Sequence, residues 1–77
     1  MNNKRRERLG KAKGYLEEAN SIVDAVRDEE EDALDNMPEN LQSGDRYDQM
    51  EECVGCLSDI IYFIESTIDK IDEVVTL

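Results

Sequence analysis

The chain has 77 residues, enough for one small domain near the size at which a single hydrophobic core only just suffices. Its two cysteines and lack of histidine exclude a disulfide framework and an ordinary zinc site within one chain. No apolar run follows the basic start, and no segment approaches the ~20 apolar residues of a membrane span. We therefore expect a cytoplasmic protein with no signal peptide and no membrane contact.

The formal net charge of -11 is unevenly distributed along the chain. Residues 1–13 hold six basic side chains and one acid, a net charge of +5. Residues 14–77 hold 19 acids and three bases, a net charge of -16. An acidic body of this kind repels nucleic acid and attracts basic protein surfaces. We expect no direct nucleic-acid binding and, if the acidity is functional, a basic host protein as partner.

Residues from about 3 to 36 are predicted to form the first helix. Its apolar residues keep a three-four spacing that is interrupted only by Glu30, and they are Leu9, Ala12, Leu16, Ala19, Val23, Val26, Ala33 and Met37. Alanines in this seam let a partner helix approach closely. Tyr15 and Ile22 widen the apolar stripe on one side.

The densest charge run lies near the end of this helix and comprises Asp28, Glu29, Glu30, Glu31 and Asp32. The plainer interpretation is a solvated helix face beside a turn, and the sharper one is a contact surface for a basic partner. Nothing in the local sequence separates these two interpretations.

Residues 37–44 are predicted to form the turn. Pro38 cannot continue a helix and is suited to start one short turn that ends at Leu41. Ser43 or Asp45 is expected to cap the second helix with a side-chain oxygen. We expect Leu34, Met37 and Leu41 to close the end of an antiparallel hairpin.

A resemblance rests on this connection. Residues 35–42 read Asp-Asn-Met-Pro-Glu-Asn-Leu-Gln, followed by Ser43, Arg46, Met50, Glu51 and Glu52. The Asn-x-Pro-Glu-x-Leu-Gln core resembles that of a family of small acidic proteins from Gram-positive bacteria and their phages or prophages. The resemblance spans most of the chain. It implies a helical hairpin and a mobile-element origin, and it carries no catalytic or ligand residues.

Residues from about 45 to 76 are predicted to form the second helix. Its seam is unbroken and comprises Tyr47, Met50, Val54, Leu57, Ile61, Ile64, Ile68, Ile71 and Val75. A second apolar stripe runs beside it through Cys53, Cys56, Ile60 and Phe63, so that apolar residues cover roughly 160° of the helix. The opposite face is almost wholly polar and includes Asp59. A first helix with alanines in its seam is too narrow to cover this stripe.

Cys53-Val54-Gly55-Cys56 is the only short motif with a chemical precedent. A redox Cys-x-x-Cys pair usually lies at a helix N-terminus, whereas this one lies two turns inside a helix among carboxylates. The sequence favours apolar packing over a redox pair or a metal shared between two chains. Tyr62, on the acidic side of the same helix, is either a tolerated surface aromatic or an anchor for a partner.

We therefore predict an all-α, coiled-coil-like antiparallel two-helix hairpin in a single domain, residues 1–77, which pairs into a four-helix-bundle homodimer. The residues expected in self-association are Tyr15, Ile22, Cys53, Cys56, Ile60 and Phe63. Those expected to contact a basic partner are Asp28, Glu29, Glu30, Glu31, Asp32, Asp59 and Tyr62. No catalytic residue, cofactor or metal ligand is predicted.

Two functions follow from these predictions. The first is a non-enzymatic acidic protein-binding module, such as a phage-encoded inhibitor or charge mimic directed at a basic host protein. The alternative is a structural hairpin that acts by homodimerisation or by docking onto another helix.

Overall fold

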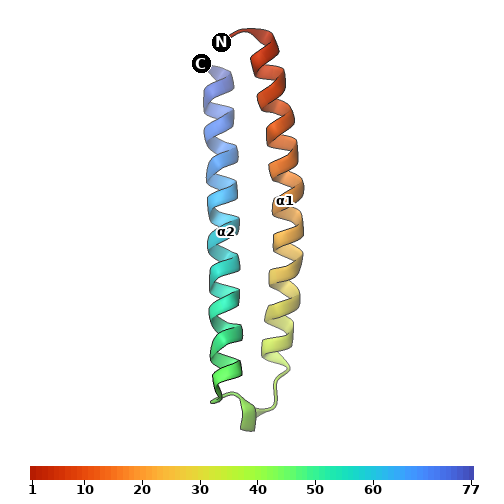
Figure 1. Ribbon diagram of the computed structural model, residues 1–77, viewed down its shortest axis with the longest axis vertical. Coiled ribbons are helices and arrows are strands. Elements are labelled where there is room, and N and C mark those ends of the chain that lie inside the picture. The colour runs from red at the N-terminus through yellow and green to blue at the C-terminus, as the bar shows by residue number, and fades with distance from the viewer.

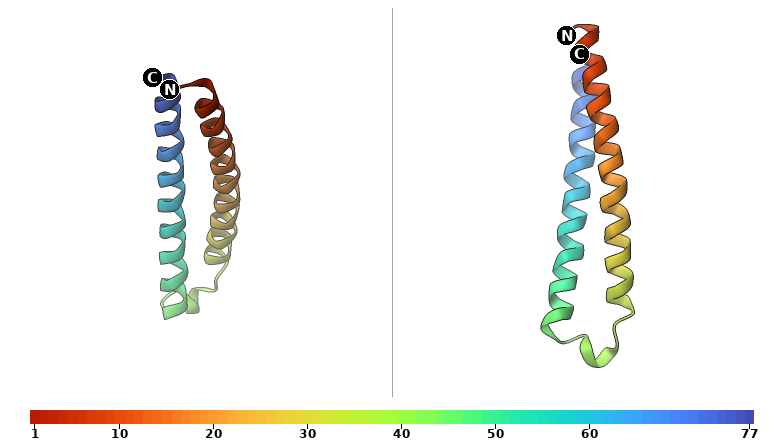
Figure 2. Two further views of the ribbon diagram at one scale, coloured as in Figure 1. Left: turned by 45° about the horizontal axis from the view of Figure 1, so that its top comes forward. Right: turned by 45° about the vertical axis from the view of Figure 1, so that its right-hand side comes forward.

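The computed structural model describes all 77 residues as two long helices joined by a short connection. Helix α1 spans Asn3–Asp35, the 3-10 helix η1 spans Glu39–Leu41, and α2 spans Asp45–Thr76. The helices run antiparallel, with both termini at one end and the connection at the other (Figure 1). They remain side by side in the two turned views (Figure 2). The predicted all-α helical hairpin is confirmed.

The two long helices begin in different ways. The side chain of Asn2 caps α1, because its Oδ1 accepts a hydrogen bond from the backbone N–H of Arg5 at 2.9 Å. Gly44 occupies the capping position of α2 and no side chain bonds the first turn there. The prediction that Ser43 or Asp45 caps this helix is therefore wrong. Asp45 and Asp48 lie in the first turn, where their charges favour the positive end of the helix dipole.

The connection is closed by the polar residues of the Asn-x-Pro-Glu-x-Leu-Gln core. Asn36 follows α1, and its Nδ2 donates to the carbonyl of Asp32 at 2.8 Å. Pro38 immediately precedes η1, as predicted. The Nε2 of Gln42 donates back across the turn to the carbonyl of Met37 at 3.0 Å. These bonds give the motif a structural role in turning the chain.

Apolar packing closes the turn only in part. Leu34 is buried and Met37 is half-buried, in line with the prediction for the end of the hairpin. Leu41 is exposed, so the prediction that it helps to close the hairpin is wrong. Its place in the outward-facing 3-10 turn keeps it away from both helices.

The interior is a single narrow seam between the helices. Only Leu34 and Ile61 are buried, each with 8% of its surface exposed. All nine predicted seam residues of α2 are buried or half-buried, which confirms that seam. A pair of helices has no third element to cover its margins, so most seam residues stay partly open to water.

The seam of α1 differs from the prediction. Val26 and Ala33 are exposed, and Leu34 is buried instead. The helix is rotated so that a row with seven-residue spacing faces α2, namely Arg6, Lys13, Asn20, Arg27 and Leu34. Burying Leu34 in place of Ala33 removes more apolar surface from water. The rotation brings polar side chains into the seam and leaves an alanine-rich row at its margin.

Candidate interaction surfaces

The hairpin has two unlike faces, because the rows that flank the seam differ on its two sides. On each helix, the residues one position before the seam residues form a row along one flank of the seam, and the residues one position after them form a row along the other flank. In an antiparallel pair, the preceding rows of the two helices lie on the same side of the hairpin. With the side chains next to them, these rows form what we call the apolar face. It comprises Ala12, Tyr15, Ala19, Ile22, Val26 and Ala33 of α1 with Cys53, Cys56, Ile60, Phe63, Thr67 and Val74 of α2.

The opposite side, which we call the acidic face, is formed by the rows that follow a seam residue. Its carboxylates are Glu17, Asp24 and Glu31 of α1 with Glu51, Glu65 and Asp72 of α2. Asp72 acts on Lys13 through the ion pair and Glu17 acts on it through its charge, so one member of each row lies on the same side of the hairpin. The chain is therefore amphipathic as a whole hairpin and not only helix by helix.

All six residues predicted to take part in self-association are exposed on the apolar face. Tyr15 and Ile22 are each 62% exposed, and Cys53, Cys56, Ile60 and Phe63 are exposed as well. Because Lys13 lies beside Asp72 and both helices rise equally per residue, Ile22 lies at the level of Phe63. By the same register Val26 lies level with Asp59, one residue from Ile60. The structure therefore gathers residues from both helices into one apolar strip.

Not all residues predicted to contact a basic partner lie on one surface. Asp28, Glu29, Glu31, Asp32, Asp59 and Tyr62 are exposed. Glu30 is half-buried at the seam, so it is not part of an open acidic surface. This correction follows from the heptad position of Glu30, which continues the row of Leu9, Leu16 and Val23. The exposed carboxylates surround the turn-proximal part of the rod instead of forming a compact cluster.

The charge is strongly polarised along the rod, which the linear sequence does not show. The turn end, residues 28–52, holds eleven acids and one base, a net charge of -10. The open end, residues 1–13 and 69–77, holds seven bases and four acids, a net charge of +3. The rod is 59 Å long, so these charges are separated by several Debye lengths at physiological salt. The two ends present opposite potentials to a partner.

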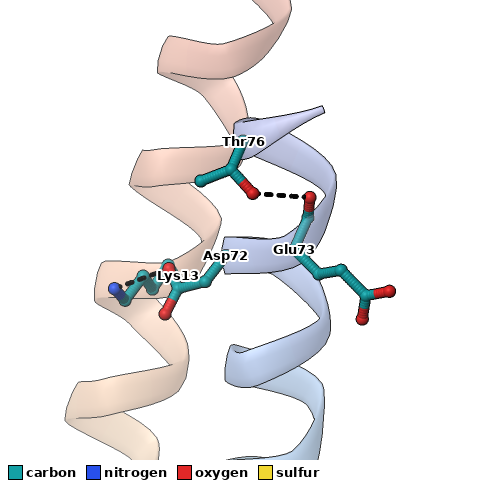
Figure 3. A network of polar contacts seen from close by, with 4 residues as sticks. All are labelled: Lys13, Asp72, Glu73 and Thr76. Carbon is teal, nitrogen blue, oxygen red and sulfur yellow. Dashed lines mark hydrogen bonds and ion pairs between the residues drawn. The ribbon is translucent and has the colours of Figure 1, made fainter.

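One ion pair joins the two helices. Lys13 Nζ lies 2.8 Å from Asp72 Oδ1 (Figure 3). Lys13 Nζ donates a hydrogen bond to Asp72 Oδ1. This bond, together with the negative charges of Asp72, Glu17 and Asp69, raises the pKa of Lys13 above its ordinary value of 10.5. The sequence predicts pairing of the basic start with Asp69, Asp72 and Glu73. The Asp72 pair is formed, whereas Glu73 pairs with Lys70 of its own helix at 3.4 Å.

Three buried polar atoms of the α1 seam lack a hydrogen-bond partner. They are Arg6 Nε, Asn20 Oδ1 and Arg27 Nε. The guanidinium of Arg27 reaches Asp24 at 2.8 Å and Asp28 at 3.6 Å through its NH2 group, on its own helix. The spacing of apolar residues did not predict this polar row. Its seven-residue spacing was the available signal, and the alanines masked it by offering a second apolar phase.

The Cys53-Val54-Gly55-Cys56 motif lies on the surface of α2, and both thiols are free and exposed. No group of three or more potential ligand side chains is placed to hold a metal ion. At the other end of the apolar face, a shallow open groove is lined by Met1, Arg5, Arg8, Leu9 and Ala12. The apolar face thus has thiols toward the turn and arginines toward the termini.

Comparison of the chain with family models, with curated proteins and with solved structures gave no match. The resemblance of residues 35–52 to phage and prophage proteins therefore stays a prediction. Neither helix contains an apolar stretch long enough to cross a bilayer. The class that the fold defines is an acidic helical hairpin with one apolar face.

Proposed function

We propose that the chain is a non-enzymatic protein-binding module whose acidic turn end contacts a basic surface on another protein. The observation that carries this proposal is the concentration of charge, -10 over residues 28–52, at one end of a narrow rod. Such a field attracts a basic surface over long distances and accelerates association. A phage-encoded inhibitor or charge mimic of a basic host protein fits this surface, and its phage origin rests on the sequence resemblance alone.

The carboxylates of the turn end are available to an external cation. Glu29, Glu31 and Asp32 are exposed and form no ion pair within the chain. Asp28 Oδ1 lies 3.6 Å from the guanidinium of Arg27. Nearer the termini, Asp72 pairs with Lys13 and Glu73 pairs with Lys70. A basic partner at the turn end therefore has no internal bridge to break.

The test is a pull-down from a Gram-positive lysate, followed by affinity measurements with the purified captured protein. The variant Glu29→Gln, Glu31→Gln, Asp32→Asn removes three charges at the turn end. The control Glu7→Gln, Glu18→Gln, Glu65→Gln removes three exposed charges elsewhere. We expect affinity to fall about tenfold between low and physiological salt, and the turn-end variant to lose far more affinity than the control. Salt-insensitive binding, or equal losses in the two variants, would contradict the proposal.

A second candidate function is a structural assembly module, and the exposed apolar face favours it. In that case Ile60→Lys with Phe63→Lys abolishes assembly, while the turn-end charge variant assembles normally. Solution mass and affinity for the captured basic protein, both measured on both variants, separate the two functions, because the basic-partner function predicts loss of that affinity in the charge variant.

A further inference from the structure

We propose that the apolar face is covered by a second copy of this chain, turned end for end. The two hairpins then form a two-fold symmetric four-helix bundle in which the open end of each covers the turn end of the other. This inference does not rest on the proposed basic partner, since it is argued from the apolar face, which does not include Glu31 or Asp32 of the turn end. The orientation follows from surface area, residue sizes and charge.

The single hairpin exposes far more surface than a compact chain of its mass. Its accessible surface is 5933 Å², and the scaling for folded monomers gives about 4,800 Å² at 8.8 kDa. The excess of about 1,100 Å² exceeds the ~800 Å² that each partner buries in a standard interface. Its radius of gyration of 17.5 Å likewise exceeds the ~11.5 Å of a compact domain of this length. The hairpin therefore exposes enough surplus surface for a second copy to cover one face of it.

The apolar face is suited to helix packing. The α1 row is narrow, with Ala12, Ala19 and Ala33 around Val26, so that another helix can approach closely. The α2 row holds Cys53, Ile60, Thr67 and Val74. The hydroxyl of Thr67 donates to the carbonyl of Phe63 at 2.7 Å and needs no partner across an interface. Between Ala12 and Val26 of α1, and between Cys53 and Thr67 of α2, the apolar face carries no charged side chain. Its rows continue toward the ends of the rod with Arg5, Arg8, Glu29 and Lys70.

Both rows are centred at one level of the rod. The midpoint of the α1 row, from Ala12 to Ala33, falls between Ile22 and Val23. The midpoint of the α2 row, from Cys53 to Val74, falls between Phe63 and Ile64. Ile22 lies level with Phe63, so the two midpoints lie at the same level. A two-fold axis that crosses the rod at this level places α1 against the partner's α1 and α2 against the partner's α2. Ala12 then lies near the partner's Ala33, and Cys53 lies near the partner's Val74. All neighbouring helices are antiparallel.

Charge selects this arrangement over the alternative with both turns at one end. The alternative brings together two turn ends, each with a net charge of -10, and two open ends, each with +3. The end-for-end arrangement places each +3 end over a -10 end. Arg5, Arg8 and Lys11 of one chain then lie level with residues 34–40 of the other, which include Asp35 and Glu39. Opposite charges across the interface fix the orientation.

The decisive test is the distance between the two turns in solution. A spin label is attached to Ser43→Cys, at the exposed tip of the hairpin, in a chain that also carries Cys53→Ala and Cys56→Ala. The full-length protein is then measured by pulsed electron–electron double resonance. With an axis near Ile22 and Phe63, a rise of 1.5 Å per residue predicts a label separation of about 60 Å. A separation of about 10–20 Å would place the turns together and overturn the proposal, as would the absence of any dipolar signal.

A matched pair of variants tests the face itself. Phe63 and Tyr62 are adjacent on α2, are 65% and 66% exposed and contact each other edge to face, but Phe63 lies on the apolar face and Tyr62 does not. We expect Phe63→Lys to weaken dimerisation at least about tenfold by sedimentation equilibrium and Tyr62→Lys to change it less than about threefold. Equal effects of the two substitutions, or none from either, would overturn the assignment of this face. Circular dichroism verifies that each variant is helical. The distance between the spin labels is measured in a chain with Phe63 and Tyr62 unchanged, so it tests the orientation of the dimer independently of these two variants.

Discussion

At the residue scale, the pair of Lys13 and Asp72 is the one charged contact that joins the helices. It lies at the open end, where the basic start of α1 meets the carboxylates that precede the end of α2. Both side chains remain partly open to water, so the pair contributes little to stability and more to the alignment of the helices. It also sets the level at which Ile22 meets Phe63, on which the symmetry of the apolar face depends.

The raised pKa of Lys13 gives this contact a defined pH dependence. A basic group whose pKa is higher in the folded state stabilises that state below its unfolded pKa, and the contribution is lost as the pH rises through the folded value. We expect Lys13→Met to lower Tm slightly at pH 8, with the difference from the wild type disappearing above pH 10.5. Thermal melts of the two proteins across this range measure it. Lys4→Met serves as the control, since Lys4 is exposed and forms no ion pair. A Tm difference between Lys13→Met and the wild type that persists at alkaline pH would rule out the ion pair with Asp72 as its cause.

At the element scale, the two helices differ in how well their buried sides follow from their sequences. The α2 seam is spaced without interruption and its residues are large, so one phase is clearly favoured. The α1 sequence offers two phases, one through Ala12, Ala19 and Ala33 and one that ends in Leu34. A pattern of apolar positions treats alanine and leucine alike, whereas packing favours the larger side chain. The rotation of α1, and with it the polar row, therefore could not be predicted from periodicity.

Asn20 tests the cost of that polar row. Its Oδ1 is buried without a partner, and Leu16 and Val23 flank it along the seam. We expect Asn20→Leu to stabilise the protein by about 1 kcal/mol, because it removes an unsatisfied carbonyl and adds apolar packing. Urea denaturation measures the change. The neighbouring Ser21→Leu, at an exposed position, is expected to change stability by less than about 0.5 kcal/mol. A loss of stability in Asn20→Leu would show that the amide is satisfied and required for the register.

The connection illustrates a different limit of sequence-based prediction. Pro38 and the short turn that follows it are identifiable because proline has one backbone preference and no N–H to donate. The cap of α2 was wrongly predicted, since Ser43 and Asp45 flank the capping position that Gly44 occupies. A shift of one residue is enough to move a side-chain oxygen out of reach of the first turn. The bonds of Asn36 and Gln42 depend on the folded turn and have no signature in spacing.

At the scale of the whole molecule, two properties arise only when the helices are placed side by side. The apolar stripes of α1 and α2 lie on the same side of the hairpin and become one face. The basic start and the acidic middle of the chain come to lie at opposite ends of a 59 Å rod. The sequence predicted the excess apolar width and the acidic body, but their arrangement depends on the antiparallel register. Dimerisation uses the apolar face, whereas Glu31 and Asp32 of the turn end lie outside it, so dimerisation leaves these two carboxylates for a basic protein.

Sedimentation equilibrium of the unmodified chain, from low micromolar to submillimolar concentration, tests most directly whether the exposed face needs a second copy. A hairpin with only two buried residues is expected to be a dimer over this range, with twice the chain mass of 8.8 kDa. A single helical species of 8.8 kDa at every concentration would contradict the account, because Ile22, Ile60 and Phe63 would then remain in water without consequence.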